Sequence, residues 1–151
     1  MADCIFCRIA KGEIPSSKLI EDEHSLAFMD IGPINPGHAL LIPKKHYERL
    51  TDMPGALVAE VTAHLPRLAR AVVAATNAEG FNVFQTNGAC SGQVVPHVHF
   101  HIIPRRTADG KGWPWRAEKY PPGEMEKLHA RILEALKRPD SLQIGDRRWR
   151  S

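Results

Sequence analysis

The sequence lacks three features that would each point to a different class of protein. No run among its 151 residues approaches the roughly 18 consecutive apolar residues of a membrane-spanning helix. The N-terminus has no basic region leading into an apolar stretch, so no secretory signal is expected. Three cysteines cannot all pair, which argues against a disulfide framework and favours a reducing compartment, the cytoplasm.

The chain also has little excess charge of either sign. Lysine and arginine number 20 against 17 aspartates and glutamates, a formal net charge of +3. This excess suits a small anionic ligand, but it is too small and too dispersed to indicate a nucleic-acid-binding surface. The length predicts one domain. We therefore expect a small-molecule partner, and neither nucleic acid nor a membrane.

Apolar spacing and turn residues predict the first half of the fold. Apolar positions at helical spacing predict a short helix over 5–11, which Gly12 ends. Alternating or continuous apolar segments bounded by turn residues predict strands at 18–21, 25–30, 38–43, 81–86 and 95–103.

Two longer helices are expected as well. Asp52 is positioned to cap a helix that begins near Pro54, and Pro66 should kink or break that helix. An amphipathic helix over 125–136 follows, and a basic tail over 147–150 ends the chain. Because strands and helices do not alternate regularly, the pattern predicts an α+β domain with a mostly antiparallel sheet.

The most unusual feature is a set of histidines at every second position, His97, His99 and His101. In a strand, all three imidazoles would lie on one face, roughly 6.5 Å apart. Burying so many idle polar groups on one face is costly, so a chemical role is expected. Metal binding and nucleophilic attack on phosphorus are both open. The preceding run 92–94 offers backbone N–H groups and an amide to phosphate oxygens, which favours phosphorus.

The pair Cys4 and Cys7 has three interpretations. A thioredoxin-like redox pair normally follows a strand of a βαβ unit, and only three residues precede Cys4. Two idle thiols and half of a tetrahedral Cys₂His₂ zinc site both stay open, because no histidines follow at zinc-finger spacing.

The run 87–103, with its pattern His-apolar-His-apolar-His-apolar-apolar, resembles the signature of the histidine triad (HIT) family. Segments 4–15, 27–31 and 36–46 are similar to the family in order and spacing, so the resemblance covers about residues 3–106. It implies a HIT-like α+β fold, with an antiparallel sheet of about five strands, two main helices, and sheets that join across a homodimer. Residues 1–106 would form the core, and 107–151 a C-terminal extension of the same domain.

The resemblance also implies a chemistry. HIT proteins bind nucleoside phosphates and cleave a bond at the α-phosphorus through a transient nucleotidyl-histidine. By this similarity His99 is the nucleophile, and His101 and His38 share protons around it. The implied binding residues for a purine nucleotide that releases AMP are Ile5, Phe6, Ile9, Phe28, Asp30, Ile31, Asn87, Gly92, Gln93, Val94, His99 and His101. The apolar residues would wall the base, Asp30 would accept hydrogen bonds from the ribose, and the loop residues would hold the phosphate.

The branch within the family stays open. The Hint branch commonly has serine where this chain has Val94, so no hydroxyl is available there. Nucleoside 5′-phosphoramidates and dinucleoside polyphosphates are both candidate substrates. A zinc-stapled nucleotide-binding adaptor without enzymatic activity is the alternative from another class.

The resemblance to bacterial, zinc-binding members of the family implies a complete metal site. Those proteins use two cysteines, the histidine after a Lys-Lys pair and the first triad histidine. Carried over to this sequence, the structural zinc ligands are Cys4, Cys7, His46 and His97. His97 would then serve the metal and take no part in catalysis.

Overall fold

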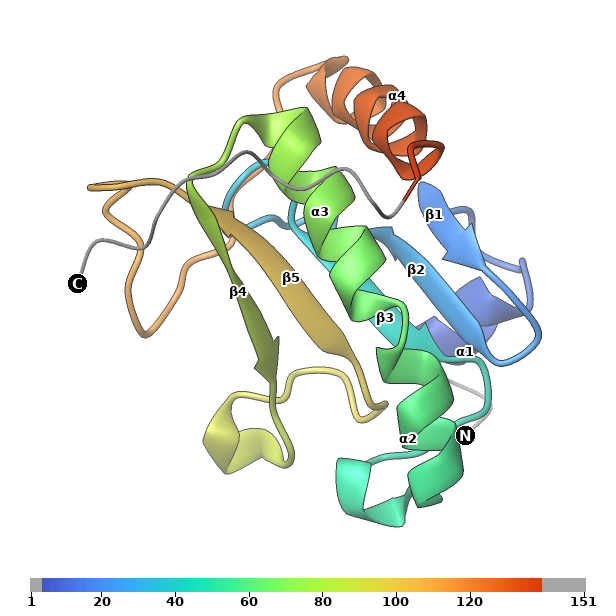
Figure 1. The fold of residues 1–151 in the computed structure, drawn as a ribbon. Helices are drawn as coiled ribbons and strands as arrows, with labels where there is room; N and C mark the ends of the chain where they lie inside the picture. The colour runs from blue at the N-terminus through green and yellow to red at the C-terminus, as the bar shows by residue number, and fades with distance from the viewer. Residues whose placement is uncertain (1–3, 140–151) are drawn as a thin grey trace.

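The computed structural model describes residues 4–139 and is built on one antiparallel sheet (Figure 1). The five strands lie in the order β1-β2-β3-β5-β4, and every pairing between neighbours is antiparallel. Their bounds are β1 Lys18–Glu21, β2 Ser25–Met29, β3 Ala39–Pro43, β4 Gly80–Gln85 and β5 Phe100–Arg105. The α+β prediction with an antiparallel sheet is therefore confirmed.

Helices cover both faces of this sheet. Their bounds are α1 Ile5–Ala10, α2 Gly55–Thr62, α3 Leu65–Thr76 and α4 Glu124–Leu136, with short 3₁₀ turns η1 Leu50–Asp52 and η2 Ala89–Ser91. Alternate residues of β3 point to opposite faces. Leu41 packs in the cluster that contains the α3 residue Leu68, whereas Leu40 packs in the cluster that contains the α1 residue Phe6. Helix α4 lies beside α3 and also contacts β1, where Nε2 of His129 lies 2.6 Å from the carbonyl oxygen of Lys18 (Figure 1).

The two predictions for the central helices have different outcomes. A break is confirmed, because α2 ends at Thr62 and α3 starts at Leu65. Pro66 lies in the first turn of α3, where its missing N–H needs no partner. The prediction that Asp52 caps α2 is wrong. Its carboxylate accepts the N–H of Arg49 at 3.0 Å, within η1, and α2 begins without a side-chain cap.

The predicted strand over 95–103 is shorter than expected, because β5 begins only at Phe100. The N–H of His97 turns back to the carbonyl of Val95 at 2.8 Å. The N–H of Val98 donates to Tyr47, outside the sheet, at 2.7 Å. His97 and His99 therefore precede the strand, and the prediction that three imidazoles share one strand face is wrong.

The strand β4 forms one edge of the sheet and presents apolar side chains to solvent. Phe81 and Val83 are 43% and 46% exposed. Among the described residues, no helix is long and apolar enough to cross a membrane. The basic tail over 147–150 lies outside the described residues.

Candidate functional site

His99 is held with one ring nitrogen committed and the other free. Its Nδ1 lies 2.6 Å from the carbonyl oxygen of His97. A carbonyl can only accept, so Nδ1 carries the proton, and Nε2 of the neutral ring keeps a lone pair. Within residues 4–139, Nε2 of His99 has no hydrogen-bond partner. The Phe6 ring packs edge-on against the imidazole, with ring centres 5.2 Å apart. The site thus presents an oriented, unpaired imidazole nitrogen.

His38 and His101 form a directed proton chain beside it. The backbone N–H of Ile34 donates to Nδ1 of His38 at 3.2 Å, so the neutral His38 ring carries its proton on Nε2. That Nε2 lies 2.8 Å from Nδ1 of His101 and donates to it. His101 therefore keeps its own proton on Nε2, which has no partner among the described residues. The rings of His99 and His101 lie with their centres 4.8 Å apart.

Burial keeps these imidazoles neutral. Desolvation, with a contribution from the neighbouring His101, lowers the pKa of His38 to about 3. Desolvation lowers the pKa of His101 to about 4 and lowers the pKa of His99 as well. A neutral ring is the form that can attack phosphorus, because an imidazolium has no free lone pair.

The carboxylate of Asp30 adjoins this chain. One oxygen, Oδ1, accepts the N–H of Gly32 at 2.8 Å, and the other lies 3.7 Å from Nε2 of His38. Burial raises the pKa of Asp30. Of the residues expected to wall the base, Phe6, Ile9 and Phe28 are buried in one cluster, whereas Ile5 and Ile31 are exposed.

The expected phosphate loop is tied together by its own side chains. Gln93 accepts the N–H of Gly88 at 2.6 Å and donates to the carbonyl of Glu48 at 2.7 Å, so both ends of its amide are used. Asn87 accepts the N–H of Leu50 at 2.7 Å. Val94 is 89% exposed. In this structure Gln93 and Asn87 shape the loop. The backbone N–H groups of residues 91–93 bond within it, so those of Val94 and Val95, which have no partner among the described residues, are the donors left for a phosphate.

An aromatic group joins that loop to the histidines, and sequence reasoning did not predict it. Trp113 packs so closely on Gly92 that a Cβ there would come within 2.8 Å of the indole. Phe84 contacts Trp113, Trp115 and His101, with ring centres 5.7, 4.7 and 6.1 Å away. The Trp113-Pro114-Trp115 segment therefore packs on its own chain.

Four ligand-type side chains converge at the start of α1, as the resemblance implied. Nδ1 of His97 lies 3.4 Å from Sγ of Cys4, 3.6 Å from Sγ of Cys7 and 3.3 Å from Nδ1 of His46. Sγ of Cys7 lies 3.4 Å from Nδ1 of His46. Tetrahedral zinc places sulfur and nitrogen ligands about 3.5 Å apart and two nitrogens about 3.3 Å apart. These four of the six ligand–ligand distances thus fit the edges of a zinc tetrahedron, and all four atoms lie within 4.8 Å of one another.

The surroundings of His97 fit the same role. Its Nε2 lies 2.8 Å from the carbonyl oxygen of Pro43, so Nε2 holds the proton and Nδ1 is free to bind a metal. By contrast, the group Asp30, His38 and His101 does not fit. Its two nearest nitrogens are 2.8 Å apart, a distance set by a shared proton and too short for two ligands of one zinc ion.

Comparison with known proteins identifies relatives over most of the chain. A family model described as "HIT domain" matches residues 11–108. The adenosine 5′-monophosphoramidase HNT1 of Candida albicans is 41% identical over 150 residues, 95% of this chain and 97% of the relative. The adenylylsulfatase HINT3 of Arabidopsis thaliana is 45% identical over 107 residues, 71% of this chain and 54% of the relative.

One similar solved structure contains zinc. The crystal structure of a Zn-bound histidine triad family protein from Mycobacterium smegmatis superposes with a TM-score of 0.78. It is 36% identical, and the alignment covers 89% of this chain and 94% of that protein.

Proposed function

The chain belongs to the histidine triad family, and from that premise we propose that it is an AMP-releasing hydrolase of purine nucleoside phosphoramidates. The observation that carries the proposal is the protonation pattern of the three catalytic histidines. Nε2 of His99 keeps a lone pair because Nδ1 donates to the His97 carbonyl, and burial holds the ring neutral. The phosphoramidase name of a relative aligned over 95% of this chain favours this substrate class over dinucleoside polyphosphates.

The proposed reaction has two displacements at the α-phosphorus. Nε2 of His99 attacks phosphorus, the P–N bond breaks, and the leaving nitrogen departs as ammonia after gaining a proton. A water molecule then attacks the nucleotidyl-histidine and releases AMP and the free imidazole. One water is consumed overall. Its oxygen stays on phosphorus, and one of its protons replaces the proton that the ammonia carried away. Splitting the reaction in this way replaces one difficult displacement with two easier ones.

We assign proton exchange to His101 and substrate binding to the residues around it. Nε2 of His101 carries a proton and has no partner within residues 4–139, because His38 donates to the other nitrogen. The ribose would bind the free oxygen of Asp30, and the base would pack against Phe6 and Phe28. The backbone N–H groups of Val94 and Val95, which have no partner within residues 4–139, would hold the phosphate oxygens.

We propose that zinc binds Cys4, Cys7, His46 and His97 in a structural role. All four tetrahedral positions would be protein ligands, which leaves no open position for a substrate. The metal would join α1, the segment after β3 and the segment before β5. The fit of the four ligand atoms and the Zn-bound relative support this assignment.

We propose further that two copies pair through β4 and that residues 107–139 belong to the same domain as the core. The exposed Phe81 and Val83, on a strand edge that no other described residue pairs, support the homodimer. The packing of α4 on α3 supports the single domain. The cytoplasm is the compartment we propose, since thiolate ligands need reducing surroundings.

The first test is AMP release from adenosine 5′-phosphoramidate by the wild type and by His99→Ala. We expect the variant to lose turnover by at least about 10³-fold, because the whole two-step route depends on one nucleophile. Diadenosine polyphosphates, assayed in parallel, distinguish the two candidate substrates.

A matched control is His24→Asn, which changes an exposed histidine on the β1–β2 turn and should keep full activity. A wild type that binds AMP but turns over neither substrate would contradict the proposal and leave the nucleotide-binding adaptor. Residual activity of His99→Ala close to the wild-type rate would reject His99 as the nucleophile.

A further inference from the structure

The tautomer of His38 depends on a loop, residues 31–37, that lies between β2 and β3. This loop supplies the Ile34 N–H that donates to Nδ1 of His38. Its Asn35 carbonyl also accepts the backbone N–H of His38 at 3.0 Å. If the loop moved, Nδ1 of His38 would lose its donor, and the ring could hold its proton on either nitrogen. The loop therefore determines the direction of the proton chain toward His101.

The side chain of Asn35 ties this loop to residues outside it. Its amide nitrogen donates to the carbonyl of Pro104 at 2.9 Å and to Oδ2 of Asp109 at 3.0 Å. Both acceptors belong to the end of β5 and the turn that follows it. Asn35 is thus the link between that turn and the two contacts that orient His38.

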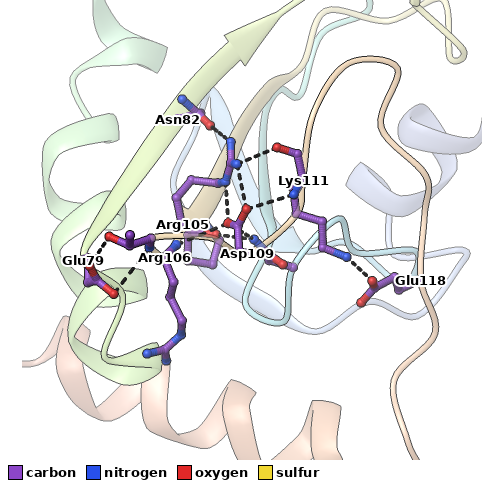
Figure 2. Close-up of polar contacts among 10 residues, drawn as sticks. Glu79, Asn82, Arg105, Arg106, Asp109, Lys111 and Glu118 are labelled. Carbon is purple, nitrogen blue, oxygen red and sulfur yellow. Dashed lines mark hydrogen bonds and ion pairs between the residues drawn. The ribbon is translucent and has the colours of Figure 1, made fainter.

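Asp109 is the centre of a dense hydrogen-bond cluster (Figure 2). Arg105 donates to both of its oxygens, at 2.7 and 2.9 Å, and the N–H groups of Arg106 and Lys111 donate at 3.2 and 2.9 Å. Arg105 in turn donates to Asn82 on β4 at 2.7 Å. The paired Arg105 guanidinium holds the pKa of the Asp109 carboxyl well below its usual range. The carboxylate is thus a charged, fixed acceptor for Asn35.

Two further contacts hold the same loop from the segment after Asp109. The N–H of Glu118 donates to the carbonyl of Pro33 at 2.7 Å. The Tyr120 hydroxyl accepts the N–H of Gly37 at 2.9 Å. Residues 104–120 therefore contact the 31–37 loop at its start, middle and end.

We propose that Asn35 and Asp109 are positioning residues for the reaction, which hold the Ile34 N–H on His38 and so keep the proton chain directed toward His101. Neither side chain needs to touch the substrate for this role. The inference rests on the proposed hydrolase function, since it assigns these residues to the proton chain of that site.

The test compares Asn35→Ala and Asp109→Asn with the wild type by two independent measurements. The first is long-range ¹H–¹⁵N correlation of the histidine rings, which reports the protonated nitrogen of His38 without any turnover. The second is the kcat and KM for adenosine 5′-phosphoramidate. We expect mixed His38 tautomers and a kcat lowered by about 10- to 100-fold in Asn35→Ala, the scale of a small misplacement, with KM within twofold. Asp109→Asn, which keeps the shape of the turn, should shift both measurements in the same direction.

Glu118→Gln is the matched control, because it removes an ion pair with Lys111 in the same segment and leaves the backbone contact to Pro33 in place. It should keep the wild-type tautomers and kcat. The inference is overturned if folded Asn35→Ala or Asp109→Asn keeps a single His38 tautomer and wild-type kcat. Should Asn35→Ala fail to fold, Asp109→Asn decides. If the wild type shows no turnover but both variants still change the His38 tautomer, the proposed function is contradicted and the positioning role is not.

Discussion

His38 shows how strongly a single residue can be constrained by burial. It is 1% exposed, and both ring nitrogens are engaged, one by Ile34 and the other by His101. A charged His38 would lose solvation and repel any charge on His101, which is why its pKa is lowered to about 3. The folded protein therefore needs a neutral His38 ring for its stability, and the proposed chemistry needs the same neutral ring.

A pH dependence of stability follows from this. In the unfolded chain His38 has its ordinary pKa of 6.5, so between about pH 6.5 and 3 the unfolded state binds more protons than the native state. Stability is therefore fully present above pH 6.5 and is lost as the pH falls below it. We expect the Tm of the wild type to fall between pH 6.5 and 5, measured by calorimetry.

The variant His38→Gln should make that dependence less steep, because glutamine does not titrate, while the buried His101, whose pKa is also lowered, remains. The relevant quantity is the slope of Tm against pH, since the variant's absolute Tm also reflects altered packing. Exposed His24→Asn serves as the comparison and should keep the wild-type slope. An unchanged slope in His38→Gln would show that other groups cause the acid sensitivity.

Among the elements, α1 depends most on its surroundings. It has six residues and begins without a side-chain cap. Isolated helices this short are not stable in water. Phe6 and Ile9 bury its apolar side, and the two thiols at its start face His46 and His97. We infer that zinc supplies the second attachment of α1 to the sheet.

Removal of the two thiols tests this inference. We expect metal analysis to find one equivalent of zinc per chain in the wild type and none in the double variant Cys4→Ser/Cys7→Ser. Zinc present at a hundred times its Kd would add about 2.7 kcal/mol to the free energy of unfolding. In a chain of this length, that loss corresponds to a Tm lower by roughly 5–10 °C.

Cys90→Ser is the matched control, because Cys90 is exposed in the loop after β4, outside the cluster. It should keep both the zinc and the Tm. Wild-type protein prepared without chelator that contains no zinc, and takes none up on addition, would end the zinc proposal.

At the scale of the whole molecule, the open edge of the sheet is the feature that calls for a partner. Within residues 4–139, β4 pairs on one side only, with β5, and its Phe81 and Val83 are half exposed. Unpaired strand edges with apolar side chains tend to associate. A second copy of the chain on this edge would pair β4 and cover both side chains.

The variant Val83→Lys tests this pairing. We expect wild-type protein to sediment at twice its chain mass of 16.8 kDa, and Val83→Lys to sediment as a monomer. Burying a lysine against a second copy leaves its charge without a partner, which opposes association. Glu23→Lys adds the same side chain at the β1–β2 turn, on the opposite edge, and should stay dimeric. A monomeric wild type at micromolar concentration would refute the dimer.

Much of the fold follows from local patterns in the sequence. The strands at 18–21 and 38–43 and the opening helix lie where apolar spacing and turn residues place them, within a few residues. The interruption before Pro66 follows from a missing N–H, a property of one residue. The identity of the four possible zinc ligands came from the resemblance to a family. Two local predictions are wrong. Asp52 bonds within a 3₁₀ turn and does not cap α2, and the segment before Phe100 bonds to Tyr47 and does not extend β5.

The sequence by itself determined the residue types of this site, because imidazoles, thiols and a glycine loop in this order carry a recognisable chemistry. Only the tertiary structure decided which of those residues contact one another and which ring nitrogens carry protons. His97 contacts Cys4, 93 positions away in the chain, and so belongs to the cysteine cluster, apart from His99 and His101. The proton direction between His38 and His101, and the contact of Asn35 with Asp109, likewise join residues 63 and 74 positions apart. Hydrogen bonds between distant segments leave no periodic signal in the chain, so only the folded arrangement reveals which nitrogen holds each proton.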